Sequence, residues 1–157
     1  MNEGGPPGRF APSASPLVLP RVVSGQSPAT TPSVKVTTVA LGLVHRDGRW
    51  FLQRRELKNQ VLPGRWEFPG GKAKEGETPE DALRRELQEE LDWRPSSIRA
   101  LECAMYHYAG RVVSLHPFLC EGNCRARTQL SWGWFTLDEV RRLPIPEANF
   151  ALLERLR

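Results

Sequence analysis

The chain has 157 residues, which is the length of a single domain and enough to bury a hydrophobic core. Its net charge of +4 is modest, and its lysines and arginines are scattered, so the composition does not require a nucleic-acid-binding surface. No apolar run approaches the roughly 20 residues of a membrane span, and three cysteines, an odd number, suit a reducing cytosol better than a disulfide framework. We therefore expect a cytoplasmic protein that has no membrane partner and requires no nucleic-acid partner.

Residues 1–33 differ in composition from the rest of the chain. They hold half of the 14 prolines, much serine and glycine, and only short apolar stretches such as Leu17-Val18-Leu19. Such a segment cannot bury enough surface to offset the entropy of ordering. We expect a disordered tail over 1–33, with translation starting near Val34 as the alternative, and a folded domain over 34–157.

Strand and helix patterns alternate along that domain. Apolar and β-branched runs predict strands at 34–44, 50–55, 66–68, 98–108, 112–120 and 130–135, with hairpin turns at Asp47-Gly48 and Ala109-Gly110. Helices are predicted from Thr78, from Thr136 through Leu143, and over 147–157, where Phe150, Leu153 and Leu156 form an apolar stripe. This order predicts an α/β fold in which helices cover a mixed sheet.

The helix that begins at Thr78 follows a glycine-rich loop. Thr78 is a suitable N-cap, Pro79 fits the first helical position, and Asp81 can close a capping box. At about 100° per residue, one stripe collects Leu83, Leu87 and Leu91. The stripe predicts that this helix packs on the domain core.

Three carboxylates, those of Glu86, Glu89 and Glu90, gather beside the stripe, and Glu90 lies nearest to it. Carboxylates within one turn repel one another, and a hard divalent cation such as Mg²⁺ would neutralise them with the oxygen ligands it prefers. A solvated charged face is the alternative interpretation. A metal site is favoured by the glycine loop, Glu77 and Arg85, which precede the carboxylates in the chain.

The spacing of Gly71, Glu77 and the run from Arg85 to Glu90 resembles the Nudix box of hydrolases that act on nucleoside diphosphate-linked substrates. Asp92 stands where that family usually has a glycine, and aspartate tolerates the left-handed conformation needed there. The resemblance implies a Nudix-type α/β/α sandwich with a mixed sheet. It also implies metal ligands at Gly70, Glu86, Glu89 and Glu90, with Mg²⁺ or Mn²⁺ as the cofactor.

Within that family the chain is most similar to the MutT branch, which hydrolyses oxidised purine nucleoside triphosphates. The similarity lies in the run from Trp66 to Lys72 and in Pro146-Glu147-Ala148-Asn149. It implies that substrate binds at Arg55, Phe68, Lys72, Arg111 and Asn149. Asn149 would read the base, because an amide pairs at once with the O6 acceptor and the N7–H donor of 8-oxoguanine, while ordinary guanine has no N7–H.

The expected reaction is Mg²⁺-dependent hydrolysis of 8-oxo-dGTP or a similar triphosphate to the monophosphate and pyrophosphate, which sanitises the nucleotide pool for DNA replication and repair. Either Glu86 or Glu89 would activate the water, while Arg85 and Glu77 would hold the loop to the helix. The MutT branch has a further acidic residue before the last strand, but the span 123–135 has none, and Thr128 or Gln129 stands there. This leaves open the source of the base and the number of metals.

Two other functions compete with this one. The second hairpin, with Gly110-Arg111 and Leu115-His116, is also similar to relatives that hydrolyse CTP and modified pyrimidine triphosphates. A non-catalytic nucleotide-binding module of the same fold is the other alternative, although such modules usually lose helix carboxylates that this chain keeps. We expect a monomer or a homodimer.

Overall fold

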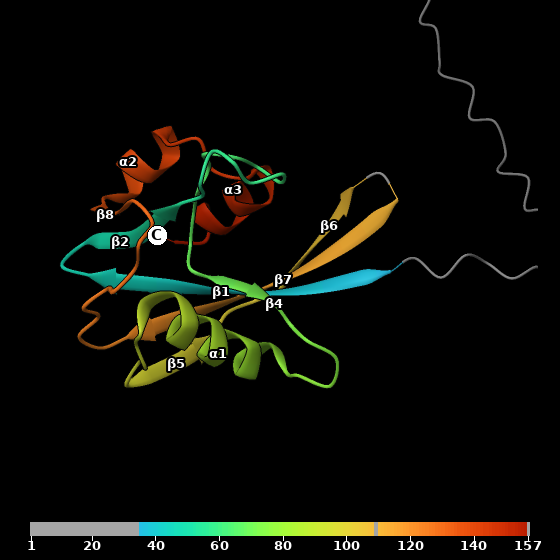
Figure 1. Ribbon diagram of the computed structural model, residues 1–157, viewed down its shortest axis with the longest axis horizontal. Coiled ribbons are helices and arrows are strands. Elements are labelled where there is room, and N and C mark those ends of the chain that lie inside the picture. The colour runs from blue at the N-terminus through green and yellow to red at the C-terminus, as the bar shows by residue number, and fades with distance from the viewer. Residues whose placement is uncertain (1–34, 109, 157) are drawn as a thin grey trace, which may run out of the picture. The chain divides into compact units, whose positions relative to one another are not determined.

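The computed structural model describes residues 35–108 and 110–156. The segment interpreted as a tail lies outside these residues. Two long strands, β1 (Val36–Arg46) and β7 (Arg111–Glu121), run parallel through the middle of the sheet, from the pair Val36 and Val112 to the pair Val44 and Cys120. Figure 1 shows them at the centre of the domain. The parallel pairing makes the sheet mixed, as predicted.

The shorter strands pair with these two. On one side, β2 (Arg49–Arg54) forms a hairpin with β1 and also pairs with β3 (Trp66–Glu67) and β8 (Trp132–Phe135). On the other side, β5 (Ser97–Ala100) and β6 (Ala104–Tyr108) both pair antiparallel with β7. The single strand predicted over 98–108 was therefore wrong, because the chain leaves the sheet between Ala100 and Ala104.

Helices cover both faces of the sheet. The helix α1 (Pro79–Leu91) lies on one side of it, and α2 (Leu137–Arg142) with α3 (Glu147–Leu153) lies on the other (Figure 1). Alternate residues of β1 divide between the layers, because successive side chains of a strand point to opposite faces. Ala40 and Val44 join the α1 cluster, while Leu41 and Leu43 join the α2 and α3 cluster. Burial on both faces explains why β1 reads as a nearly continuous apolar run.

The predicted helix starts and the α1 stripe are confirmed. The N–H of Asp81 donates to the Thr78 side chain at 3.1 Å, so Thr78 caps the helix. In a full capping box the Asp81 carboxylate would accept from the Thr78 N–H. Here it accepts from the Thr78 hydroxyl instead, at 2.6 Å. Leu83, Leu87 and Leu91 are fully buried. Asp92 ends the helix at φ 50°, in the left-handed conformation expected there.

The closing helix differs from the prediction. It ends at Leu153, and Phe150 is 46% exposed while Leu152 is 2% exposed. The predicted stripe was therefore wrong at Phe150, because the helix turns Ala148, Leu152 and Leu153 toward the sheet. Among the described residues, no helix has the length and apolar character to cross a membrane.

This correction can be tested by truncating two side chains of α3. Leu152→Ala is expected to lower the free energy of unfolding by about 2–5 kcal/mol, because it leaves a cavity in the core. Phe150→Ala is expected to cost less than about 1 kcal/mol, because much of that ring is already in water. Urea unfolding of both variants measures the difference, and equal losses would contradict the arrangement described for α3.

Candidate active site

A short strand carries the glycines that were predicted to form a loop. The strand β4 (Gly70–Lys72) pairs antiparallel with β1, so that Leu41 lies opposite Gly70 and Val39 opposite Lys72. Gly70 has φ 140°, and a Cβ there would overlap the Ala40 carbonyl. At Gly71 a Cβ would lie 2.5 Å from the Glu86 carboxyl carbon. These two glycines let the β4 backbone approach both the central strand and α1 closely.

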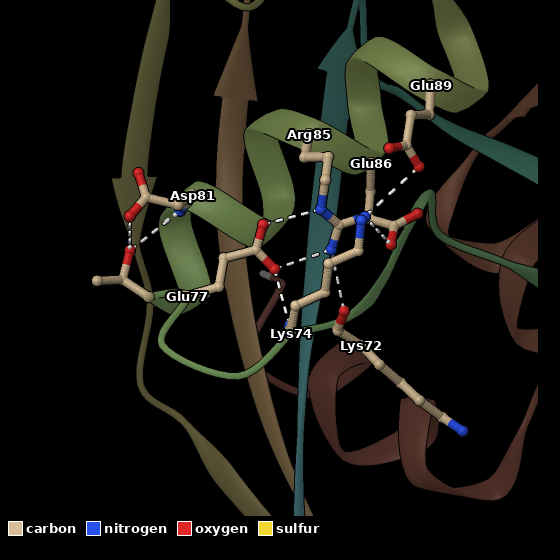
Figure 2. Close-up of polar contacts among 8 residues, drawn as sticks. Lys72, Lys74, Glu77, Asp81, Arg85, Glu86 and Glu89 are labelled. Atoms are coloured by element: carbon tan, nitrogen blue, oxygen red, sulfur yellow. Dashed lines mark hydrogen bonds and ion pairs between the residues drawn. The ribbon is translucent and has the colours of Figure 1, made fainter.

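Arg85 connects the loop before α1 to the carboxylates on the helix. Its guanidinium donates to both carboxylate oxygens of Glu77, at 2.8 and 2.9 Å, to Glu86 at 2.7 Å, and to the Lys72 carbonyl at 3.1 Å (Figure 2). The predicted salt link between Glu77 and Arg85 is therefore confirmed. Hydrogen bonds from Arg85, and then from the Lys74 N–H, lower the pKa of Glu77 to about 2. Hydrogen bonds to Glu77 and Glu86 raise the pKa of Arg85.

Glu89 and Glu90 have contrasting surroundings. The Glu89 side chain is 57% exposed, and its only ion pair among the described residues is a 3.4 Å contact with Arg85. Glu90 is partly buried and accepts a hydrogen bond from the Gly70 N–H at 3.0 Å. Burial raises the pKa of Glu90 to about 7, and the nearby charges of Glu86 and Glu67 add to the rise. Glu90 is thus a partly buried carboxylate that holds its proton more strongly than an exposed glutamate does.

The donor atoms of the α1 face suit a hard cation, although the carboxylates are turned apart. Among residues 35–108 and 110–156, no three His, Cys, Asp or Glu side chains converge closely enough to hold a metal ion. Glu86 faces Arg85, Glu89 faces solvent, and Glu90 faces β4. Glu90 has no cationic partner in the described part of the chain, so a cation beside it would relieve an unfavourable charge. Carboxylate and carbonyl oxygens are the ligands that Mg²⁺ prefers.

A cleft of about 600 Å³ opens beside β4. It gathers four of the residues predicted to bind substrate, which come from separate parts of the chain: Arg55, Lys72, Arg111 and Asn149. The rest of its wall is mainly apolar, with Val39, Leu41, Val113, Leu115 and Ala148 among the lining residues. Apolar walls with a few convergent polar groups are typical of small-molecule sites.

The polar groups of the cleft are held in different ways. Arg55 donates to the Glu67 carboxylate at 2.7 Å and to the Val61 carbonyl at 2.8 Å, so it ties the segment after β2 to the cleft wall. Asn149 is 5% exposed, and its backbone N–H bonds to the Pro146 carbonyl at 2.9 Å. Asn149 therefore places a polar group in the wall of the cleft, where it can meet a ligand.

Phe68 does not belong to the cleft wall. Its ring is 1% exposed and packs in the core cluster that includes Leu43, Leu52 and Val140. The sequence analysis expected Phe68 to bind substrate because it lies in the motif that precedes Gly70. Its side chain instead points into the core, because successive side chains of an extended segment point to opposite sides. The structure gives Phe68 a supporting position beneath the site.

Three polar side chains near the site did not stand out in the sequence. Glu67 and Glu147 line the cleft, and Gln53 is buried close to Glu90. Glu67 could have been noticed because it lies inside the motif that precedes Gly70, whereas Gln53 resembles the outward-facing polar residue of an ordinary strand. In the loop that lacks an acid, the Thr128 hydroxyl accepts a hydrogen bond from the Leu130 N–H at 3.1 Å and is not among the cleft residues.

Comparison with known proteins shows the family of the chain. The model of the NUDIX domain family matches residues 34–156, so the chain belongs to the Nudix family. It is a hydrolase of the MutT type. It is 32% identical to an 8-oxo-dGTP diphosphatase of Haemophilus influenzae over 78% of this chain and 92% of that protein. It is 29% identical to a CTP pyrophosphohydrolase of Escherichia coli over 77% and 91%.

A solved structure shows the same fold. The MutT Nudix hydrolase from Burkholderia pseudomallei superposes with a TM-score of 0.67 at 27% identity, over 78% of this chain and 99% of that one. The predicted Nudix-type α/β fold is thereby confirmed.

The raised pKa of Glu90 predicts a pH dependence of stability without metal. The folded state keeps the proton up to about pH 7, whereas the unfolded state releases it near 4.5. Stability from this group is therefore fully present below pH 4.5 and is lost as pH rises through 7, by up to about 3 kcal/mol. Glu90→Gln should remove this part of the slope. Urea unfolding at pH 5 and pH 8 with a chelator measures it, and parallel profiles for the two proteins would contradict the burial of Glu90.

Proposed function

We propose that the chain hydrolyses oxidised purine nucleoside triphosphates such as 8-oxo-dGTP to the nucleoside monophosphate and pyrophosphate. The observation that best supports this proposal is the position of β4 between the cleft and the carboxylates of α1. Its Lys72 end lines a cleft that contains Asn149, and its glycines contact Glu86 and Glu90 of α1. A nucleotide with its base at Asn149 and its phosphates at Lys72 would present its phosphates to the carboxylate-bearing helix.

The phosphate end of the site depends on opposite charges. Lys72 and Arg111 would attract the triphosphate, and Glu86, Glu89, Glu90 and the Gly70 carbonyl would hold Mg²⁺ or Mn²⁺. When bound, the metal neutralises phosphate charge as the phosphoryl group transfers. Arg55 already binds two protein acceptors, so it would contribute chiefly by holding Glu67 and Val61 at the cleft wall. Phe68 would support the wall from below.

Either Glu86 or Glu89 would accept the proton of the attacking water. Glu86 is held by Arg85 at 2.7 Å, and Glu89 touches Arg85 only at 3.4 Å and is exposed enough to reorient. Arg85 contacts both carboxylates and would chiefly fix the direction of Glu86, which it holds at the shorter distance. The enzyme would act in the cytoplasm on a small-molecule nucleotide, as a monomer or a homodimer.

Asn149 would read the base. This residue lines the cleft and is little exposed, and its amide can bond to O6 and to the N7–H of 8-oxoguanine. Undamaged guanine offers only an acceptor at N7, so one amide group would lose its partner. Leaving a buried polar group unpaired costs about 1–3 kcal/mol, which is enough to discriminate between the two bases.

A pyrimidine substrate is the second candidate. It is favoured by the similarity to a protein named CTP pyrophosphohydrolase, which is 29% identical to this chain. Release of pyrophosphate from 8-oxo-dGTP, dGTP, CTP and 5-methyl-dCTP in the presence of Mg²⁺ separates the candidates. We expect 8-oxo-dGTP to have the highest kcat/KM. A lead for CTP would leave the metal site standing and overturn the purine assignment, and no turnover of any of them would favour a binding module.

The carboxylates can be tested with variants that keep their shape. Glu86→Gln and Glu89→Gln are each expected to lower kcat about 100-fold or more, because each loses a metal ligand or the base. Glu80→Gln on the same helix is the matched control, since Glu80 is paired with Arg84 on the exposed face. Steady-state kinetics at saturating Mg²⁺ measures the effect, and full turnover by Glu89→Gln would refute its place in the site.

The role of Asn149 predicts a loss of selectivity. Asn149→Ala should reduce the ratio of kcat/KM for 8-oxo-dGTP over dGTP on the order of 10-fold, which corresponds to one lost discriminating hydrogen bond. Activity on dGTP should change less. An unchanged ratio would mean that the base is read elsewhere in the cleft.

A further inference from the structure

Gln53 has an unusual position for an uncharged polar residue. It lies in β2 directly across from Glu67 of β3, and its side chain is 1% exposed. Its Oε1 is the one buried side-chain oxygen or nitrogen without a hydrogen-bond partner among residues 35–108 and 110–156. A buried acceptor without a partner destabilises a fold, and an apolar residue would fill the same space without that cost.

The other end of the same amide points to the α1 carboxylates. The Gln53 amide lies beside the Glu90 carboxylate, and its hydrogen-bonding interaction lowers the pKa of Glu90. Glu90 also accepts from the Gly70 N–H at 3.0 Å. The Glu90 carboxylate therefore lies between the backbone of β4 and the Gln53 amide of β2. Because Oε1 and Nε2 share one carbon, the unpaired acceptor lies next to the carboxylate that we propose as a metal ligand.

The chemistry of an amide explains why glutamine stands here. The donating NH₂ group stabilises an ionised Glu90, whereas an acidic residue would repel both Glu90 and Glu67. A divalent cation of the Mg²⁺ type keeps several waters, and their hydrogens need acceptors near the metal. An apolar side chain would supply neither the donor nor the acceptor.

We infer that Gln53 is a positioning residue of the metal site, which holds the Glu90 carboxylate through Nε2 and offers Oε1 to a water ligand of the bound cation. This inference rests on the proposed function, because it assumes that Glu90 binds the cation. It accounts for an orphaned acceptor that the fold alone does not require. It also assigns a role to a strand residue outside both the glycine loop and the carboxylate helix.

Replacing Gln53 by methionine separates this role from a structural one. Gln53→Met keeps the length of the side chain and removes both polar atoms. The melting temperature with a chelator should stay unchanged or rise, since an unpaired acceptor is lost, while Mg²⁺ binding to the nucleotide-free protein, measured by calorimetry, should weaken about 10-fold. At limiting Mg²⁺, kcat should fall while KM for the nucleotide stays the same.

Two further variants complete the test. Leu52→Met is the control, because it changes the residue next to Gln53 in the chain. The Leu52 side chain packs in the cluster beneath α2 and α3, away from Glu90, so this variant should leave Mg²⁺ binding unchanged. Gln53→Asn keeps an amide that is one methylene too short to reach Glu90, and should show the same weakening as Gln53→Met even if the methionine variant folds poorly.

The outcomes distinguish this inference from the proposed function. Wild-type Mg²⁺ affinity in both Gln53 variants, or a lower melting temperature with unchanged affinity, would overturn the positioning role and leave the proposed function intact. If the wild-type protein neither binds Mg²⁺ nor turns over any nucleotide, the proposed function fails and this inference fails with it.

Discussion

The ion pair between Arg85 and Glu77 is the interaction on which the geometry of the site depends. It closes the loop between β4 and α1 with two hydrogen bonds of 2.8 and 2.9 Å, and the same guanidinium reaches Glu86 and the Lys72 carbonyl. One arginine thus fixes the loop, the helix and β4 relative to one another, as Figure 2 shows. Arginine suits this position because its planar guanidinium offers several donors in fixed directions, which lysine cannot do.

The second constraint is the close approach of β4 to its neighbours. Gly70 lies against the Ala40 carbonyl and Gly71 against the Glu86 carboxylate, so both positions exclude a side chain. This places Glu90 and Glu86 on one side of a three-residue strand whose last residue, Lys72, lines the cleft. The charges that would bind phosphate and the carboxylates that would bind metal are therefore connected through backbone, which is stiffer than any arrangement of long side chains.

Local patterns predicted much of this molecule. The cap at Thr78, the stripe of Leu83, Leu87 and Leu91, and the left-handed Asp92 all follow from interactions within a few residues, and all are present in the structure. Phe150 was misplaced because the face that a short helix turns toward the sheet depends on which of its residues pack there, and in α3 these are Ala148, Leu152 and Leu153. Phe68 was misplaced because its side chain packs in the core and not at the cleft. Gln53 could not be recognised from the sequence, because its interest lies in its proximity to Glu90 of α1, which is far from it along the chain.

The parallel pairing of β1 with β7 has a consequence for how the domain forms. The parallel pairing brings together residues that lie far apart in the chain, such as Val36 and Val112, and closing so long a loop makes folding slow. During synthesis, α1 emerges before β7 and lacks half of the sheet that its leucines cover. Its acidic face and apolar stripe are both exposed over that interval, so the unfinished domain is most susceptible to aggregation just before α1 can dock.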